Sequence, residues 1–469
     1  MKGKMLVLLG WLISLAAHAE ETRPNLLFIT VDDMNWDSVG AFGCPVEGIT
    51  PHMDRLAAEG MKFARAHVTV AICQPTRAVW MTGRYPHRNG ALGFDPIAKE
   101  VPSLPEALKG AGYLTGLLGK ERHVVPTRHA AFEVIRGMKE LGQGREVEKY
   151  REAVREFLAR AKAEERSFFL MANAHDPHRP FAGSDQEKWR PRPAVRKTYT
   201  PGEVPVPGFL PDLPEVRQEL AEYFTSVHRA DDVVGAVLEE LEAAGMKGNT
   251  LVVFVSDHGM PLPFAKTNCY YDSTRTPMIV RWPGVVEAGS ENKEDFVSGI
   301  DVAPTFLAAA GLPNLAGADG ESIVPLLKGG KVEGRNKVFT MINTISGGKA
   351  YPMRAVQDER YLYIWNGWAD GKTEFKNESQ SGRTMKAMNQ AAKTDPAVAA
   401  RVEMFVHRTT EELYDLQKDP SCLKNLLDEK GGSATSRSSA MTKALWHWMK
   451  DTDDPQRKAF EGQVELALD

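Results

Sequence analysis

The chain has 469 residues, and this length favours one large domain with a smaller one. With 42% hydrophobic and 26% charged residues, the composition is that of a soluble globular protein. The formal net charge of -4 gives no reason to propose a nucleic-acid partner, and an anionic substrate would need a local cluster of cations.

The N-terminal residues 1–19 have the pattern of an export signal. Lys2 and Lys4 precede the apolar run from Met5 to Ala17, and Ala17-His18-Ala19 places small residues where a signal peptidase reads. A membrane anchor is the alternative, but the run is short for a membrane span. We therefore expect an exported protein, periplasmic or extracellular, without stable membrane insertion.

Four cysteines occur, at wide and irregular spacing: Cys44, Cys73, Cys269 and Cys422. An even number in an exported protein permits two disulfides, but the spacing is not that of a disulfide scaffold. The pairing stays open.

The first predicted strand is the apolar run Asn25 to Val31, which suits a strand buried on both faces. It ends in Asp32-Asp33, and two carboxylates at that point need a cation or hydrogen-bond donors unless they form a solvated turn. Thr50-Pro51 opens a helix that Gly60 ends, and a strand from Met61 to His67 follows.

The segment Cys73-Gln74-Pro75-Thr76-Arg77 places a thiol at the start of a helix, where unpaired N–H groups favour negative charge. Arg77, one turn further along, faces back to the same point. The pattern predicts an anion site with a nucleophile in it. The alternative is an ordinary small buried cysteine in a strand-to-helix turn.

Polar residues also follow three later predicted strands. The strand predicted from Tyr113 to Leu118 is followed by Gly119-Lys120 and His123. The strand predicted from Ser167 to Ala172 is followed by the run His175-Asp176-Pro177-His178-Arg179. The strand predicted from Thr250 to Ser256 is followed by Asp257-His258 and, shortly after, by Lys266. In an open α/β sheet the carboxyl ends of strands are where ligands bind. Surface charges after strands and a hydrogen-bonded turn around His178 are the plainer alternatives.

The rest of the chain is predicted to be structural. Trp189 to Pro214 is rich in proline and suits an irregular surface excursion, and a long helix follows in which Asp231 and Asp232 are expected to be solvated. After residue 335, the alternation in Arg360 to Trp365 indicates an antiparallel strand, and a polar helical stretch covers Met385 to Phe405.

These motifs resemble the type I sulfatases of the alkaline phosphatase-like superfamily. The run from His175 to Arg179 is similar to the sulfamidase branch, whereas the spacing of His123 and the presence of His258 are similar to the iduronate 2-sulfatase branch. The resemblance implies an α/β fold with a large, mixed, mostly parallel sheet between helices, in a catalytic domain of residues 20–335. A smaller α+β subdomain with an antiparallel sheet would occupy residues 336–469.

The resemblance also implies the site residues. The expected catalytic residues are Cys73, Arg77, Lys120, His123, His175 and Lys266, and the expected substrate-binding residues are Lys120, His175, His178, Arg179 and Lys266. The expected metal ligands are Asp32, Asp33, Cys73, Asp257 and His258, with Ca²⁺ as the metal and Mg²⁺ as the alternative.

In the resembling family a formylglycine-generating enzyme oxidises the cysteine. The hydrated formylglycine attacks sulfur with one hydroxyl, and the second lets the sulfated hemiacetal collapse to free sulfate. The implied function is hydrolysis of sulfate esters or N-sulfate in sulfated glycans such as glycosaminoglycans. The alternatives are a phosphatase or phosphonate monoester hydrolase of the same superfamily and a non-catalytic glycan-binding relative. The oligomeric state stays open.

Overall fold

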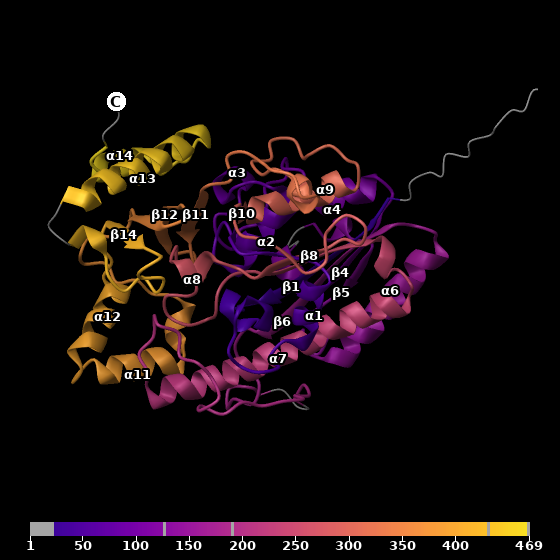
Figure 1. The fold of residues 1–469 in the computed structure, drawn as a ribbon, viewed down its shortest axis with the longest axis horizontal. Helices are drawn as coiled ribbons and strands as arrows, with labels where there is room; N and C mark the ends of the chain where they lie inside the picture. The colour runs from indigo at the N-terminus through magenta and orange to yellow at the C-terminus, as the bar shows by residue number, and fades with distance from the viewer. Residues whose placement is uncertain (1–22, 125–127, 189–191, 429–431, 467–469) are drawn as a thin grey trace, which may run out of the picture.

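The computed structural model describes residues 23–124, 128–188, 192–428 and 432–466 (Figure 1). The expected export signal, residues 1–19, lies outside these ranges. Within them, no helix combines the length and the apolar character that crossing a membrane requires.

The main sheet has eight strands, and its centre is parallel. Strands β5, β4, β6, β1 and β7 pair in parallel, whereas β8 is antiparallel to β7 and to β2. The mixed, mostly parallel sheet expected from the sequence is thereby confirmed. The spatial order is β5 (Val134–Arg136), β4 (Leu114–Leu118), β6 (Phe168–Pro177), β1 (Asn25–Asp32), β7 (Thr250–Ser256), β8 (Met278–Arg281), β2 (Met61–Phe63) and β9 (Ser290–Asn292).

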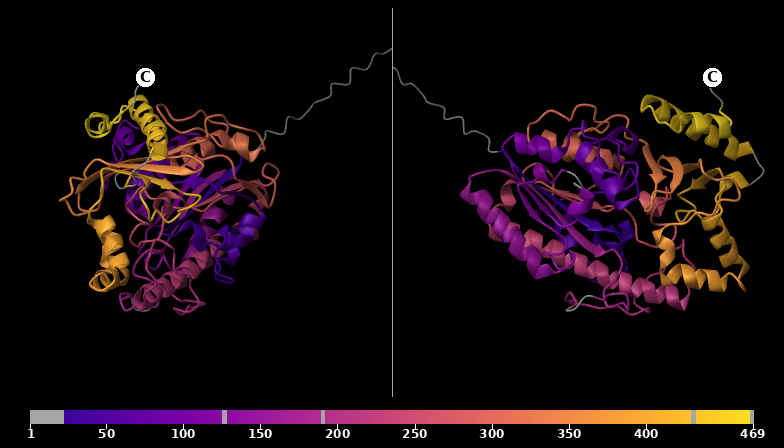
Figure 2. Two further views of the ribbon diagram at one scale, coloured as in Figure 1. Left: turned by 60° about the vertical axis from the view of Figure 1, so that its left-hand side comes forward. Right: turned by 180° about the vertical axis from the view of Figure 1, so that it is seen from behind.

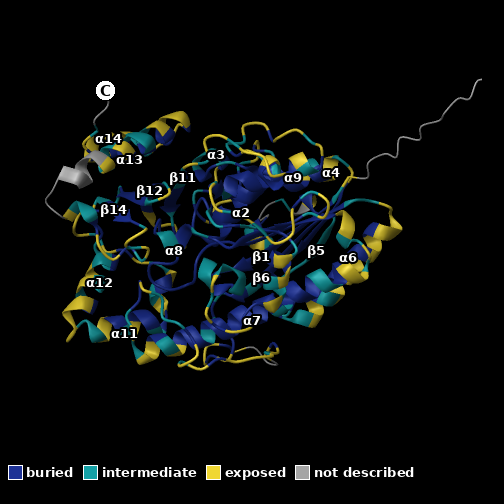
Figure 3. Cartoon of the chain, in the orientation of Figure 1, coloured by how far each residue is buried: buried dark blue, intermediate teal, exposed yellow. Residues whose placement is uncertain are grey.

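Helices cover both faces of this sheet, so β1 is buried on both sides (Figure 1). Leu27 and Ile29 pack with α1 (Pro51–Ala58), α6 (Val147–Ala163) and α7 (Pro214–Ala243). Leu26 and Phe28 point to the opposite face and pack with α2 (Cys73–Thr82), α4 (Leu104–Gly110) and α9 (Val302–Ala309). Because side chains alternate along a strand, the continuous apolar run of β1 contributes to a hydrophobic core on each face of the sheet. In Figure 3 the buried strands are dark blue and lie between helices that are exposed on their outer sides.

A second, four-stranded antiparallel sheet lies beside the first (Figure 2). Its order is β11 (Val338–Thr344), β12 (Ala350–Gln357), β13 (Tyr361–Asn366) and β14 (Glu411–Asp415). The helices of this region are α11 (Arg383–Ala391), α12 (Pro396–Val406), α13 (Gly432–Asp451) and α14 (Arg457–Gln463), and α11 also contacts α7 of the main body. The predicted division after residue 335 stays a prediction.

The remaining elements are short. They are α3 (Pro86–Asn89), α5 (Glu121–Val124), α8 (Tyr271–Thr274), α10 (Val324–Leu327), β3 (Ala66–His67), β10 (Val297–Ser298), and the 3-10 helices η1 (Trp36–Ser38), η2 (Gly40–Phe42), η3 (His129–Ala131), η4 (Lys247–Asn249), η5 (Gly299–Asp301), η6 (Glu378–Ser381) and η7 (Leu426–Asp428).

Three predictions differ from the structure. The strand expected from Met61 to His67 is two strands, because β2 joins the main sheet and β3 pairs with β10. The helical stretch from Met385 to Phe405 is divided between α11 and α12. Asp231 is fully buried, because its carboxylate accepts hydrogen bonds from the His52 and Met53 N–H groups and so satisfies the start of α1.

Candidate active site

Cys73 is the first residue of α2, as the sequence predicted. Arg77 lies one turn further along, and its Nη1 donates to the Cys73 carbonyl oxygen at 3.1 Å. The Cys73 side chain is buried, and burial raises the pKa of its thiol well above the usual value. Because the thiolate is the nucleophilic form, unmodified Cys73 is a poor nucleophile at neutral pH.

The carboxylates at the end of β1 meet Cys73 and the residue after β7. Ligand atoms of Asp32, Asp33, Cys73 and His258 all lie within 4.8 Å of one another. His258 Nε2 is 3.3 Å from Asp33 Oδ1 and 3.5 Å from Cys73 Sγ. Parallel strands whose carboxyl ends share one edge of the sheet bring these residues together.

This group fits a divalent cation. Oδ1 of Asp32 is buried and receives no hydrogen bond from the described residues, and burial raises the pKa of Asp33 to about 7. Buried carboxylates of this kind are costly without a compensating cation. Their oxygens suit Ca²⁺ or Mg²⁺, whereas an imidazole is a less usual ligand for either ion.

Asp257, also expected as a metal ligand, is engaged elsewhere. Its Oδ2 accepts from Arg77 Nη1 at 2.6 Å, and its Oδ1 accepts from the Asp33 N–H at 2.9 Å. Burial opposes its charge, but His258 and Arg77 outweigh burial and lower the pKa of Asp257. The structure thus places Asp257 beside the group of four ligand atoms, and its role as a ligand stays a prediction.

Two buried lysines pair with the carboxylates of Asp32 and Asp33. Lys120 Nζ contacts Asp32 Oδ2, and Lys266 Nζ is 2.9 Å from Asp33 Oδ1. Lys120 follows Gly119 in a turn where both have positive φ, and a side chain at Gly119 would lie 2.6 Å from the Asn173 carbonyl oxygen. Burial lowers the pKa of Lys120 to about 7, so a bound anion would help to keep it charged.

Three of the four predicted histidines lie around this cluster. His175 Nδ1 is 2.8 Å from Asp32 Oδ2, and the His178 ring stacks on His175 with centroids 4.6 Å apart. His123 packs edge-on against Phe94, and burial lowers its pKa to about 3. Burial also lowers the pKa values of His175 and His178 well below the usual value, so all three rings are neutral at neutral pH.

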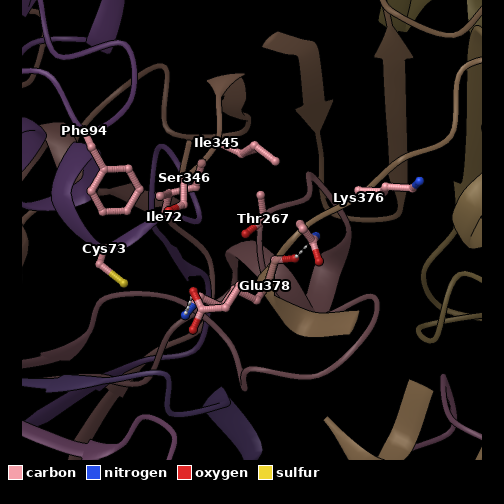
Figure 4. A pocket seen from close by; sticks show the side chains of 10 residues that line it. Ile72, Cys73, Phe94, Thr267, Ile345, Ser346, Lys376 and Glu378 are labelled. Carbon is pink, nitrogen blue, oxygen red and sulfur yellow. Dashed lines mark hydrogen bonds and ion pairs between the residues drawn. The ribbon is translucent and has the colours of Figure 1, made fainter. Parts of the chain in front are cut away.

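A pocket of about 350 Å³ opens onto Cys73 and Lys266 (Figure 4). Its wall combines the start of α2, the turn between β11 and β12, and the segment that leads into the first residue of η6. The lining residues are Ile72, Cys73, Phe94, Lys266, Thr267, Ile345, Ser346, Lys376, Asn377 and Glu378.

Comparison with known proteins identifies the family. The family described as Sulfatase matches residues 24–312, and human N-sulphoglucosamine sulphohydrolase is 31% identical over 95% of this chain and 94% of its own length. The chain belongs to the sulfatase family. It is therefore a hydrolase of the sulfatase and sulfamidase type. A second family description, N-sulphoglucosamine sulphohydrolase, C-terminal, matches residues 257–404 of this sulfatase.

Solved structures share the fold. A 2-O glycosaminoglycan sulfatase is 20% identical with a TM-score of 0.70, and the match covers 95% of each chain. The phosphonate monoester hydrolase of Agrobacterium radiobacter is 18% identical with a TM-score of 0.66, over 92% of this chain and 96% of its own. The alkaline phosphatase-like fold is thus common to enzymes that cleave different esters.

Arg179 does not line the pocket of this sulfatase. Its side chain is 8% exposed, and its guanidinium donates to Glu219 Oε1 at 3.0 Å and to the Pro261 carbonyl oxygen. Glu219 also accepts from the Thr384 N–H at 2.7 Å. Arg179 therefore ties β6 to α7 and α11, and the predicted part in shaping the substrate pocket is at most indirect.

Two functional features escaped the sequence analysis. Glu378 reaches the pocket, 3.3 Å from Lys266 Nζ and 3.4 Å from His178 Nε2, although no motif marked it. Asp176, predicted only as part of a motif, bonds the buried guanidinium groups of Arg145 at 3.0 Å and Arg229 at 2.5 Å. Arg145 in turn donates to the His178 carbonyl oxygen at 2.8 Å, so this network holds the histidine segment.

The C-terminal region also holds the segment that carries Lys266. The buried Arg408 guanidinium donates to Asn268 Oδ1, and Asn377 Nδ2 donates to the Lys266 carbonyl oxygen at 3.4 Å. Tyr270 donates to Glu412 Oε2 at 2.8 Å. The position of Lys266 therefore depends on residues of the C-terminal region.

Proposed function

We propose that this sulfatase is exported and releases sulfate from sulfated glycans, with residue 73 as the nucleophile. The observation that carries the proposal is the convergence of Asp32, Asp33, Cys73 and His258 beside two buried lysines at a pocket. Export rests on the sequence pattern of residues 1–19.

The lysines and Arg77 provide the positive charge that the reaction requires. The oxygens of a sulfate group repel an incoming nucleophile, so preorganised cations must balance their charge. Lys120 and Lys266 now pair with Asp32 and Asp33, and a sulfate entering the pocket would share these ammonium groups. Arg77 holds the Cys73 carbonyl and Asp257, which fixes the start of α2.

Residue 73 needs conversion before it can act. Its thiol is protonated at neutral pH, whereas the hydrated aldehyde of formylglycine offers a hydroxyl to attack sulfur. Asp32, Asp33, residue 73, Asp257 and His258 are the proposed holders of a divalent cation, for which Ca²⁺ is the first choice. When bound, the cation polarises the sulfate oxygens and the attacking hydroxyl.

His175 and His123 are the proposed groups for proton transfer. The ring of His175 is fixed through Nδ1 on Asp32, which leaves Nε2 for the reacting atoms. His178 and Arg179 are proposed to support this arrangement, His178 by stacking on His175 and Arg179 through its buried ion pair.

For the substrate, we propose fragments of sulfated glycosaminoglycans. The support is the similarity to human N-sulphoglucosamine sulphohydrolase along nearly the whole chain, and the fold shared with a 2-O glycosaminoglycan sulfatase. The former name indicates N-sulfate and the latter O-sulfate, so the panel of test substrates must contain both.

Sulfate release from defined N-sulfated and O-sulfated saccharides tests the proposal, next to an aryl sulfate, an aryl phosphate and a phosphonate monoester. We expect turnover of at least one sulfated saccharide to exceed that of the phosphate and the phosphonate. A strong preference for phosphate or phosphonate would favour the second candidate, a hydrolase like the Agrobacterium radiobacter enzyme. Mass spectrometry of the Cys73 peptide reports formylglycine directly.

A further inference from the structure

Glu378 presents a carboxylate inside a pocket that has to receive an anion. It belongs to η6 of the C-terminal region, and 38% of its side chain is exposed. Its oxygens lie 3.3 Å from Lys266 Nζ and 3.4 Å from His178 Nε2. The ion pair with Lys266 outweighs burial and lowers the pKa of Glu378, so the group is charged.

A charged carboxylate can only accept hydrogen bonds. It repels a sulfate and any atom with outward lone pairs, and it binds well only where the ligand presents a donor. Without such a donor the carboxylate would weaken binding in this pocket. Its presence therefore points to a hydrogen-bond donor on the substrate close to the sulfate.

The direction of the side chains locates this donor. In Figure 4 the Cys73 thiol and the Glu378 carboxylate point toward one another from opposite sides of the pocket. A nucleophile at residue 73 displaces the leaving atom on the far side of sulfur. The leaving atom of a sulfate group held on Lys266 therefore faces Glu378.

We propose that Glu378 selects N-sulfated amino sugars over O-sulfated sugars by accepting a hydrogen bond from the N–H of the scissile sulfamate. The leaving nitrogen of a sulfamate carries a hydrogen, whereas the leaving oxygen of a sulfate ester has lone pairs alone. This inference rests on the proposed function and specifies its substrate. It gives Glu378 the part of a specificity determinant and not of a proton donor.

The test compares Glu378→Gln with Glu374→Gln, which removes an exposed carboxylate of the same segment that pairs with Lys376. Turnover of glucosamine N-sulfate and of N-acetylglucosamine 6-sulfate is measured for both variants, and thermal melting checks their folding. We expect the ratio of N-sulfate to O-sulfate kcat/KM to fall at least tenfold in Glu378→Gln and to hold in Glu374→Gln. Loss of the Lys266 ion pair acts on both substrates and cancels in the ratio.

If the ratio of N-sulfate to O-sulfate kcat/KM changes less than tenfold in Glu378→Gln, the inference is overturned, even if both activities decline. A contact of Glu378 with a hydroxyl group that both substrates carry, or a structural role of Glu378, would produce that result. Calorimetric binding to Cys73→Ala protein separates this failure from failure of the proposed function. If Glu378 accepts a hydrogen bond from the N–H, Cys73→Ala protein binds glucosamine N-sulfate more tightly than N-acetylglucosamine 6-sulfate. Adding Glu378→Gln to that variant should reduce this binding preference at least fivefold. This result does not depend on whether the unsubstituted enzyme releases sulfate. Equal preference in the two proteins contradicts the inference.

Discussion

The residues around Cys73 and the C-terminal wall of the pocket hold their charges in different ways. We call the first set the buried cluster, and its members are Asp32, Asp33, Cys73, Lys120, His175 and His258. They lie at or just beyond the carboxyl ends of strands or begin a helix. All except the partly buried His175 are at most 3% exposed. The C-terminal wall consists of Ile345, Ser346, Lys376, Asn377 and Glu378, and its charged side chains are open to solvent.

The difference separates two tasks. In the buried cluster the carboxylates of Asp32 and Asp33 pair with Lys120 and Lys266. Asp33 and Lys120 also have positive φ, which is uncommon for residues other than glycine. Such rigidity suits bond cleavage, which depends on preorganised charge. The C-terminal wall is carried by loops and suits recognition, which varies among enzymes that share a fold.

The largest expected effect comes from Cys73→Ala. Sulfate release should fall to the uncatalysed level, because no other group in the buried cluster can supply the attacking hydroxyl. Removing one buried sulfur should lower the free energy of unfolding by only about 1 kcal/mol. The matched control is Cys269→Ala, another buried thiol, which should cost similar stability and retain turnover. Substantial activity in Cys73→Ala would sink the nucleophile assignment.

Asp176→Ala should destabilise the protein more than any change in the C-terminal wall. It leaves two buried guanidinium groups, those of Arg145 and Arg229, without this carboxylate, at a cost of roughly 3–5 kcal/mol. Urea unfolding measures the loss. The control Glu461→Gln breaks an exposed pair with Arg457 and should cost under about 0.5 kcal/mol. Similar losses in both variants would refute the contrast between buried and exposed charges.

Lys266→Met should lower kcat/KM by about 10²-fold, the typical effect of removing one preorganised donor from a developing charge. The same substitution at the exposed Lys376 should cost less than about fivefold, since exposed pairs contribute little. Steady-state kinetics on one sulfated substrate compare the two directly. Equal losses would mean that the two sides of the pocket share the same task.

Phe94→Ala should have the smallest effect. The ring is 40% exposed at the pocket and packs edge-on against His123. Losing its contact with a sugar should cost about 1 kcal/mol, which appears as a KM several times higher with kcat retained. A fall in kcat with KM unchanged would instead place Phe94 in the positioning of His123.

The sequence was most informative where chemistry follows a strand. An apolar run that stops at Asp32-Asp33 or at Asp257-His258 marks both a buried strand and its polar end, and parallel order brings such ends to one edge. Local pattern therefore predicted the strands and the polar residues at their ends, whereas the mixed sheet and the roles of the buried cluster came from the family resemblance. The orientation of Asp257 toward Arg77 depends on side-chain partners that no local pattern encodes.

Contacts between distant segments explain the misses. Glu378 has no local signal, because its position depends on the C-terminal region packing on the segment of Lys266. Asp231 looked like an ordinary charged position on a helix, but the start of α1 packs on it. The break after Phe63 was invisible because β3 has a partner, β10, far along the chain.

The depth of Cys73 sets a condition on the timing of maturation. Its side chain is 3% exposed, and its neighbours come from β1, α2 and the residues after β7. The proposed oxidation of this sulfur would require an enzyme to reach the surrounding chain, and the packing of α2 in the folded protein prevents that access. The proposed oxidation and folding would therefore compete for the same chain. The yield of active enzyme would then depend on the relative rates of these two processes, and not only on the stability of the finished protein.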